Sequence, residues 1–415
     1  MKKSILLSFL FMGITMSKDC FSQPIAKLTL HDVDNSIAAP VYIDLDGLTD
    51  AADSSLVLQQ LIGNKKVAVA VQIEHGYHRF LWWMVKKSGP RGTAVYELSK
   101  ADHPATKLHP IKVTDQNGSL LVTEDGKKIL NYHYQTVYPP KGVDTVFKRS
   151  GFIHPLWSPA GHVLTRINPP DHYHHVGIWN PWTKVLFQGK EVDFWNLSKK
   201  QGTVRFADFI SKTEGPVFGG FKVLQQHVVL DDPPIKKGQV ALDEVWDIRV
   251  YNLGPKIWLW DFTSTLNCAT PDPVILQKYR YGGFGFRAAK DWNNQNSKVL
   301  TSAGKTRIDA DATRARWCMI DGAIAGGHSG ILFMDYPANY NFPEPMRVWP
   351  VNANKRGDVF FSFSPTRNMD WPLMPDKRYV LKYRMLVYEG TISPKLAENT
   401  WKSFAHPPRI TVTKL

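Results

Sequence analysis

Short runs rich in valine, isoleucine, tyrosine and tryptophan recur along this chain, about ten residues apart, as in β-sandwich domains. Gly, Pro, Asn or Asp separates the runs, which is the pattern of β-strands joined by turns. Residues 256–267 alternate well, with Trp258, Trp260 and Phe262 on the opposite face from Asp261 and Thr263. The chain has no βαβ rhythm and no glycine-rich loop that opens a helix. We therefore predict an all-β fold, a large antiparallel β-sandwich.

Two segments depart from the strand pattern. Residues 394–404 (PKLAENTWKSF) are typical of a helix with proline in its first turn. Residues 56–62 (LVLQQLI) suggest one or two helical turns. Asp125-Gly126 lies between two strand-like runs and predicts a hairpin, because glycine accepts the positive φ of such a turn.

A break of two prolines and a glycine places a boundary near Lys141. It divides the chain into an N-terminal β subdomain, 23–141, and a larger β-sandwich, 142–410. Residues 1–22 resemble a secretory signal, with two lysines before an apolar run that is too short to span a bilayer. We expect a periplasmic or secreted protein with no other membrane span.

The 415-residue chain carries a formal charge of +14, from 51 Lys and Arg against 37 Asp and Glu. Such a charge either attracts an anionic glycan as a ligand or simply reflects basic side chains that are solvated on the surface. No zinc-knuckle, helix-turn-helix or basic-helix pattern is present, so we do not expect a nucleic-acid partner. Cys268 and Cys318 lie in apolar, strand-like runs. The sequence is compatible with a disulfide between them and equally with two buried free thiols.

Residues 151–184 hold the densest group of imidazoles and large aromatic side chains in the chain. Its histidines are His154, His162, His172, His174 and His175, and three tryptophans lie among them. Imidazole changes charge near neutral pH, so such a group suits acid–base catalysis or metal binding. Indole faces suit stacking on the apolar side of a sugar ring. Together they indicate a carbohydrate ligand.

The core of this stretch is Asp171-His172-Tyr173-His174-His175. In an extended segment His172 and His174 would share one face and His175 the other. The first two could then bind a divalent metal with a third ligand from His154, His328 or a carboxylate, which leaves a metal cofactor open. Alternatively, one histidine is a general acid or base whose tautomer Asp171 fixes, or the histidines are hydrogen-bonded loop residues.

Three further groups are candidates for substrate binding. Arg280 and Arg287 flank a glycine-rich segment, and Arg280 could bind a carboxylate there or face solvent on a bulged strand. Trp179 and Trp195, with Asp193 beside them, could form a sugar platform or pack in the core. Glu344 is a spare carboxylate in a proline-rich loop, and such loops often carry function.

Several motifs together resemble the DUF6807 family. They are HPLWSPAGHVLTRINPPDHYHHVGIW, YGGFGFRA, RWCMIDG, GILFMDYPANYNFPEP and SFSPTRNMDWPLMPDKRYVLKYRMLVYEG, and the similarity runs from about residue 143 to about 389. The label "methane oxygenase PmoA" that is often given to this family does not suit a β-rich chain, since particulate methane monooxygenase subunits are membrane helices.

The resemblance implies an exported bacterial protein of sugar-processing systems, with a fold like the galactose-mutarotase supersandwich. Mutarotase-like sites combine histidines, a carboxylate residue that acts as the base, and an arginine on a concave sheet. The resemblance assigns the first role to His172, His174 and His175 and the arginine role to Arg280 or Arg287. Glu344, Glu244 and Glu389 all remain candidates for the carboxylate residue.

We therefore predict an exported carbohydrate-active enzyme, a lyase or glycoside hydrolase or an epimerase. His172 or His174 would transfer the proton, and Arg280 would orient an anionic group of the glycan. Trp179 and Trp195 would stack on the sugar. The alternative is a glycan-binding protein without catalysis.

Overall fold

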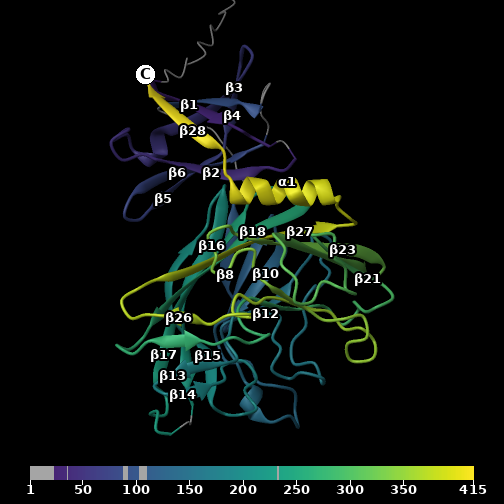
Figure 1. The fold of residues 1–415 in the computed structure, drawn as a ribbon. Coiled ribbons are helices and arrows are strands. Elements are labelled where there is room, and N and C mark those ends of the chain that lie inside the picture. The colour runs from purple at the N-terminus through teal and green to yellow at the C-terminus, as the bar shows by residue number, and fades with distance from the viewer. Residues whose placement is uncertain (1–22, 35, 87–91, 102–109, 231–232) are drawn as a thin grey trace, which may run out of the picture.

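The computed structural model describes residues 23–415 except 35, 87–91, 102–109 and 231–232 (Figure 1). The predicted signal peptide, 1–22, lies outside the described residues. Strands dominate, all strand pairs are antiparallel, and α1 is the one α-helix of the described chain. The prediction of an all-β protein is confirmed. A smaller domain sits on a larger body, and the C-terminus returns to the smaller domain (Figure 1).

The N-terminal domain consists of two small sheets around its own apolar core. The five-stranded sheet has the order β28-β1-β7-β3-β4, with β1 (Gln23–His31), β3 (Leu56–Ile62), β4 (Lys65–Val69), β7 (Ala94–Lys100) and β28 (Arg409–Lys414). The three-stranded sheet has the order β2-β6-β5, with β2 (Ala39–Asp44), β5 (Val71–His75) and β6 (Arg79–Val85). A 3-10 turn, η1 (Asp53–Ser55), precedes β3.

The segment Leu56–Ile62 is a strand, so the expectation of helical turns there is wrong. It pairs with β7 on one side and with β4 on the other. Leu56 and Leu58 alternate into the core, as strand geometry requires. Pairing on both edges overrides the weak local preference of this short segment.

The sheets divide the chain at a different place from the predicted boundary. Strands β8 (Ile111–Asp115), β9 (Ser119–Glu124) and β10 (Lys127–His133) belong to the body, where β10 pairs with β11 (Phe152–Leu156). The change of domain therefore falls after β7, ahead of residue 111, and not near Lys141. The last strand, β28, pairs with β1, so both ends of the described chain build the N-terminal domain.

The body contains two eight-stranded sheets. The histidine sheet, named for the site it carries, has the order β24-β25-β20-β12-β11-β10-β9-β8. Its remaining strands are β12 (Ile178–Trp179), β20 (Gly285–Arg287), β24 (Met346–Val348) and β25 (Phe360–Phe363). A 3-10 turn, η3 (Thr145–Phe147), lies between β10 and β11.

The second eight-stranded sheet, the long-strand sheet, has the order β15-β16-β17-β18-β27-β23-β22-β21. Its strands are β15 (Gly202–Thr213), β16 (Phe218–Val229), β17 (Val240–Tyr251), β18 (Ile257–Cys268), β21 (Ser297–Thr301), β22 (Trp317–Ile324), β23 (Gly327–Asp335) and β27 (Tyr379–Glu389). A four-stranded sheet, β14-β13-β19-β26, completes the body, with β13 (Val185–Phe187), β14 (Lys190–Val192), β19 (Val274–Leu276) and β26 (Trp371–Leu373).

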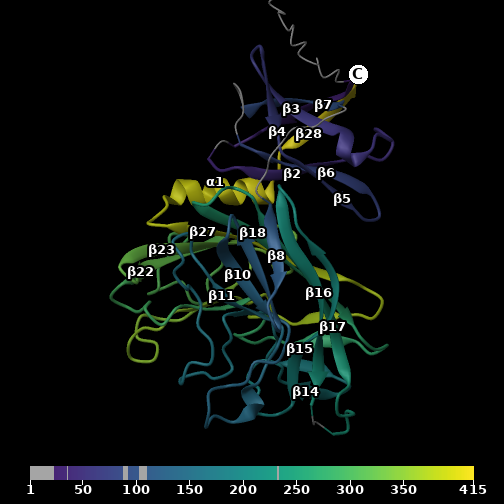
Figure 2. The same cartoon turned by 180° about the vertical axis from the view of Figure 1, so that it is seen from behind.

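The main core lies between the two eight-stranded sheets. Ile153 and Phe286 reach it from the histidine sheet, and Trp260 and Phe262 reach it from β18. On β18, Asp261 faces the other way, as the alternation of residues 256–267 predicts. One edge of the histidine sheet, β8, lies beside β16 (Figure 2).

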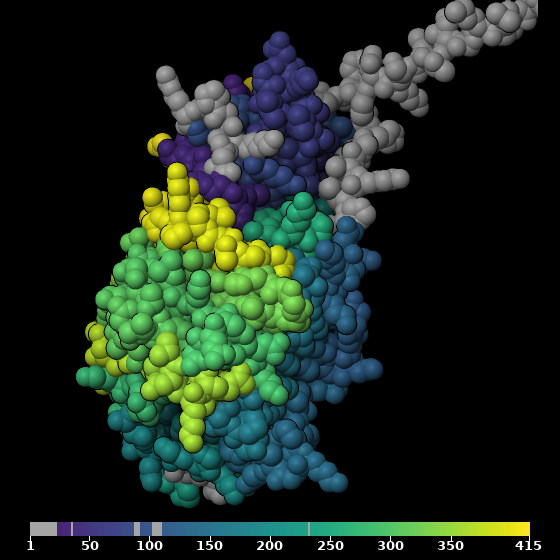
Figure 3. Space-filling model, turned by 90° about the vertical axis from the view of Figure 1, so that its right-hand side faces the viewer, coloured from purple at the N-terminus to yellow at the C-terminus, as the bar shows by residue number. Residues whose placement is uncertain are grey.

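Helix α1 (Pro394–Ala405) confirms the predicted helix at 394–404. Ser393 caps it by accepting a hydrogen bond from the Leu396 amide, and proline occupies the first turn. Its buried side chains pack on the outer face of the long-strand sheet. In Figure 3 this yellow segment lies between the purple N-terminal domain and the green strands of the body.

Two other expectations concern local chemistry. Asp125 and Gly126 have φ of 52° and 76° and join β9 to β10, which confirms the predicted hairpin. Cys268 and Cys318 are both free thiols, so the disulfide does not form. Among the described residues, no helix is long and apolar enough to cross a membrane.

Candidate functional site

The site lies on the outer face of the histidine sheet, away from the main core. Ile153, Ile178 and Phe286 are paired across neighbouring strands and point into the core. Strand alternation therefore turns their neighbours outward. The outward row is His133 of β10, His154 of β11, Trp179 of β12, Arg287 of β20 and Phe360 of β25.

The histidine motif forms a turn above this row, not an extended strand. The His172 amide donates to the Pro169 carbonyl at 2.9 Å and the His175 amide to the His172 carbonyl at 3.0 Å. Asn168 closes the turn through its side chain, which donates to the Tyr173 carbonyl at 2.6 Å. The expectation that His175 points away from its neighbours is therefore wrong. The ring of His175 lies 4.7 Å from that of His172 and 4.7 Å from that of His174.

Asp171 and His172 form a hydrogen-bonded pair at the start of the turn. His172 Nδ1 lies 2.9 Å from Asp171 Oδ2, and Asn354 and Arg287 donate to the same oxygen at 2.8 Å each. Burial raises the pKa of Asp171, but the hydrogen bonds of His172 and Arg287 and the charge of Arg287 hold it well below its usual value. An ionised Asp171 places the His172 proton on Nδ1 and leaves the lone pair on Nε2. The His172 side chain is 32% exposed, so solvent reaches this ring.

Arg287 is a buried clamp beneath the turn. It forms ion pairs with Asp171 at 2.8 Å and Asp358 at 3.0 Å, and its guanidinium lies 4.7 Å from the centre of the Trp349 ring. Burial lowers its pKa, and the two carboxylates oppose that shift. Its charge is therefore compensated within the protein, and its contacts hold Asp171 in position.

The other histidines of the site are neutral near pH 7. Burial lowers the pKa of His174 to about 3, and the electrostatic influence of His172, Arg149 and Arg287 adds to the shift. Burial lowers the pKa of His154 to about 4, and its Nδ1 lies 2.9 Å from Thr165 Oγ1. These imidazoles can act as hydrogen-bond partners of a ligand without carrying charge.

His175 lies beneath the other rings of the turn. Its ring centre is 5.0 Å from Trp179, 5.1 Å from Phe360 and 5.6 Å from Trp349. Burial lowers its pKa well below the usual value, and neighbouring positive groups add to that. Because it is buried in this aromatic group, His175 supports the turn and is shielded from a ligand.

The two tryptophans expected to stack on a sugar are buried. Trp179 is 1% exposed and Trp195 is 2% exposed, and their rings pack 5.1 Å apart. The Asp193 carboxylate is also buried. It accepts hydrogen bonds from the Trp195 amide at 2.9 Å and from the backbone amide and the side-chain Nδ2 of Asn196. In this structure the three residues form the floor of the site and offer no open stacking face.

The structure adds Tyr281 and Arg347 to the candidates for substrate binding. Tyr281 is half-buried and accepts a hydrogen bond from Trp349 Nε1 at 3.1 Å. The guanidinium of Arg347 lies 5.1 Å and that of the exposed Arg280 5.5 Å from the Tyr281 ring. Arg347 is paired with Asp311 at 2.8 Å, whereas no described carboxylate lies within ion-pair distance of Arg280. In the sequence, apolar Met346 and Val348 alternate with Arg347, and this alternation indicates that the Arg347 side chain turns away from the core.

None of the three candidate glutamates contacts the histidine turn. Glu344 is fully buried, where the Tyr383 hydroxyl donates to it at 2.9 Å, and burial beside Asp335 raises its pKa well above the usual value. Glu244 is also fully buried and accepts hydrogen bonds from Asn180, Ser264 and Trp246 at 2.6 to 2.7 Å, with His227 at 2.9 Å. Each carboxylate is thus held by the core.

Glu389, His162 and His328 also lie away from the histidine turn. Glu389 accepts a hydrogen bond from the Ser329 hydroxyl at 2.9 Å, and His162 Nδ1 lies 3.1 Å from that hydroxyl. His328 pairs with Asp321 at 2.7 Å across β22 and β23 of the long-strand sheet. His162 and His328 are therefore not parts of the site above the histidine sheet.

The metal expectation involves His172 and His174. Among the described residues, the group whose ligand atoms converge closely enough to hold an ion is Asp44, Asp46 and His78. It lies in the N-terminal domain, where His78 Nδ1 is 2.9 Å and 3.1 Å from the two carboxylates. The described turn histidines do not form such a group.

Comparisons with solved structures give distant similarities. An α-mannosidase from Enterococcus faecalis V583 has 8% identity and a TM-score of 0.48, over 94% of this chain and 46% of that one. This chain thus spans about half the length of the mannosidase. A GalM/aldose epimerase homologue from C. elegans has 10% identity and a TM-score of 0.28, over 70% of this chain and 100% of that one. A putative aldose 1-epimerase from Klebsiella pneumoniae has 10% identity and a TM-score of 0.30, over 92% and 94%.

No curated protein sequence matches the chain. The model of DUF6807, described as a family of unknown function, matches residues 119–402. This range contains all strands of the body except β8, and it includes the histidine turn. The chain therefore belongs to the DUF6807 family.

Proposed function

We propose that this protein is an exported carbohydrate-active enzyme that abstracts a proton from a sugar carbon, and that it acts as a lyase on a glycan containing uronic acid. The observation that carries the proposal is the Asp171–His172 pair at the partly exposed edge of an aromatic site. A carboxylate that holds the proton on one imidazole nitrogen leaves the lone pair of the other nitrogen free to accept a proton.

In the proposed reaction, His172 Nε2 takes the proton on the carbon next to the uronic acid carboxylate. The electron pair of that C–H bond forms a C=C bond, the neighbouring glycosidic C–O bond breaks, and the leaving oxygen receives a proton. Arg280 is exposed and has no described carboxylate partner, so it can neutralise the substrate carboxylate and stabilise negative charge on that carbon.

Glycoside hydrolysis fits this site less well than elimination does. Most glycoside hydrolases place two carboxyl groups on either side of the bond that breaks. The carboxylates nearest the turn, Asp171 and Asp358, are both bound to Arg287, and the three candidate glutamates are engaged elsewhere. Epimerisation begins with the same proton abstraction and differs in returning the proton to the other face.

The proposal also includes export, on the strength of residues 1–22. Mass spectrometry of the intact protein from a native-type bacterial host tests this part. We expect a mature chain that begins at Gln23 and is recovered from the periplasm or medium. A full-length chain in the cytoplasm would contradict it.

A product assay with the mature protein tests the reaction. Anionic and neutral oligosaccharides are incubated with it, absorbance reports unsaturated sugars, and mass spectrometry reports cleavage. We expect an unsaturated product from an anionic glycan, and its loss in His172→Ala. The matched control is His328→Ala, which removes another histidine paired with a carboxylate, Asp321, on the opposite sheet. That variant should retain activity.

Each other outcome contradicts part of the proposal. Cleavage without a double bond would indicate a hydrolase. Unchanged masses with new sugar signals by NMR would indicate an epimerase. Binding without any chemical change would indicate a glycan-binding protein, and equal activity of wild type and His172→Ala would remove His172 from the mechanism.

A further inference from the structure

A cavity lies on the opposite side of the sandwich from the histidine site. It has a volume of about 440 Å³, within the range of about 300–1,000 Å³ that is typical of ligand sites. Strands β2, β5 and β6 of the N-terminal domain line one wall, the outer face of β17, β18 and β27 lines another, and the end of α1 closes it. Figure 1 shows these elements meeting where the N-terminal domain joins the body.

The wall from the N-terminal domain is aromatic. Tyr42 of β2 pairs in register with Trp82 of β6, so both side chains lie on one face of the three-stranded sheet. The Tyr42 ring lies 4.5 Å from Trp82 and 5.3 Å from Phe80. Trp82 also packs on Phe218 of the body, but Tyr42 remains 50% exposed. Domain docking therefore leaves an aromatic face open to the cavity.

The wall from the body is polar and rigid. Arg384 of β27 binds Asp261 of β18 through two hydrogen bonds of 2.6 and 2.8 Å, and the Tyr251 hydroxyl donates to the same carboxylate at 2.9 Å. Because these groups hold one another in place, a ligand orders few side chains when it binds them.

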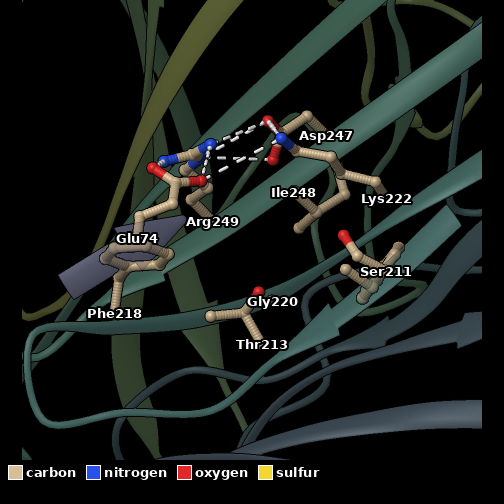
Figure 4. A pocket seen from close by; sticks show the side chains of 10 residues that line it. Glu74, Ser211, Thr213, Phe218, Gly220, Lys222, Asp247, Ile248 and Arg249 are labelled. Carbon is tan, nitrogen blue, oxygen red and sulfur yellow. Dashed lines mark hydrogen bonds and ion pairs between the residues drawn. The ribbon is translucent and has the colours of Figure 1, made fainter. Parts of the chain in front are cut away.

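A second set of paired charges joins the two domains at this cavity. Figure 4 shows Glu74 of β5 meeting Arg249 of β17, with Asp247 on the other side of the guanidinium. The Arg249–Glu74 contacts are 2.7 and 2.9 Å long. The Gln72 side chain of β5 accepts the Val217 and Phe218 amides nearby, so the domains are fixed to each other on this side.

The charges of the lining balance. Its acidic side chains are Glu74, Asp247 and Asp261, and its basic side chains are Arg249, Lys382 and Arg384. An anion would find each arginine already bound to a carboxylate. A neutral polyol would find fixed donors and acceptors on one side and aromatic rings on the other. That combination matches the hydroxyl edge and the C–H face of a pyranose.

We propose that the cavity between the N-terminal domain and the long-strand sheet is a carbohydrate-binding site for neutral sugar units. It is independent of the histidine site, since the two eight-stranded sheets lie between them. Its role is to hold a neutral part of a glycan, with Tyr42 stacking on the sugar and the Arg384–Asp261 pair bonding its hydroxyls.

Affinity electrophoresis of the mature protein tests the proposal, with native gels that contain soluble mannan, β-glucan, galactan, arabinoxylan or polygalacturonate. We expect at least one neutral polysaccharide to retard the protein. Tyr42→Ala removes one stacked ring and should therefore weaken the affinity for that polysaccharide about tenfold. Tyr77→Ala is the matched control, because Tyr77 belongs to the same domain, is 98% exposed and does not line the cavity.

A second variant fills the cavity without removing an aromatic residue. Thr263 lines it from β18 and is partly exposed, so Thr263→Phe should also weaken the retardation. His172→Ala should bind as wild type does, which separates this site from the proposed lyase site. The proposal is overturned if no neutral polysaccharide retards the protein, if polygalacturonate alone does so, or if both cavity variants bind as tightly as Tyr77→Ala.

Discussion

His174 should make the protein less stable in acid, because its imidazole is held neutral in the fold. Burial, followed by the electrostatic influence of His172, Arg149 and Arg287, lowers its pKa to about 3, against 6.5 for a free histidine. The perturbation that tests this is His174→Gln, which keeps a polar side chain but cannot take up a proton.

The magnitude follows from the difference in proton binding between the folded and unfolded chains. Below pH 6.5 the unfolded His174 binds a proton and the folded one does not, so acid favours unfolding. The stability that the neutral ring preserves is complete above pH 6.5 and is lost as the pH falls towards 3. At about 1.4 kcal/mol per pH unit, the loss between pH 7 and pH 5 is about 2 kcal/mol.

Urea unfolding at pH 7 and pH 5, followed by tryptophan fluorescence, gives the free energy of unfolding for both proteins. The other histidines, His154 and His175 included, are present in wild type and variant, so their contributions cancel in the comparison. We expect His174→Gln to lose about 2 kcal/mol less than wild type on acidification. His406→Gln, at an exposed residue, should behave as wild type. Equal losses in wild type and His174→Gln would refute the reasoning.

Three further changes test other parts of the structure. Asp171→Asn removes the charge that orients His172 and should lower turnover about 100-fold or more, with little change in substrate KM; steady-state kinetics showing an unchanged kcat would contradict this. Glu244→Leu leaves buried donors without an acceptor and should cost about 3–5 kcal/mol in urea unfolding, whereas a wild-type midpoint would argue against it. Deleting 409–415 removes β28 from β1 and should speed proteolysis within the N-terminal domain; unchanged digestion would count against that pairing.

The sequence predicts the class of fold well because strand periodicity is local. Alternation along 256–267 and the turn at Asp125-Gly126 need no knowledge of distant partners. The two failures depend on such partners. Leu56–Ile62 is a strand because β4 and β7 pair with it, and the body begins with β8 because that strand joins a sheet that continues past Lys141. The proline-rich break near Lys141 is a loop within the body, so local composition marked a turn and not a domain boundary.

The site shows the same division between local and distant contacts. Asp171 and His172 are neighbours in sequence, and their pairing follows directly from the motif. Trp349 follows β24 and Asp358 precedes β25, far along the chain, and only the order of the strands in the sheet brings them to the turn. Nothing in the local sequence distinguishes Arg287 as the buried clamp from Arg280 as the exposed cation.

The three glutamates show why an unassigned carboxylate in a sequence is a weak sign of catalysis. A buried carboxylate is costly unless other groups hydrogen-bond it, so the fold supplies partners wherever it buries one. Tyr383 and Asn339 hydrogen-bond Glu344 in this way, and Asn180, Ser264 and Trp246 hydrogen-bond Glu244. Asp171 and Asp358, which do reach the turn, are both bound by Arg287. Asp171 is held ionised, because hydrogen bonds and the charge of Arg287 lower its pKa, so it is a poor proton donor. A site with a histidine base, compensated acids and an exposed arginine is suited to taking a proton from carbon, and protonation of a leaving oxygen would fall to a hydroxyl or to water.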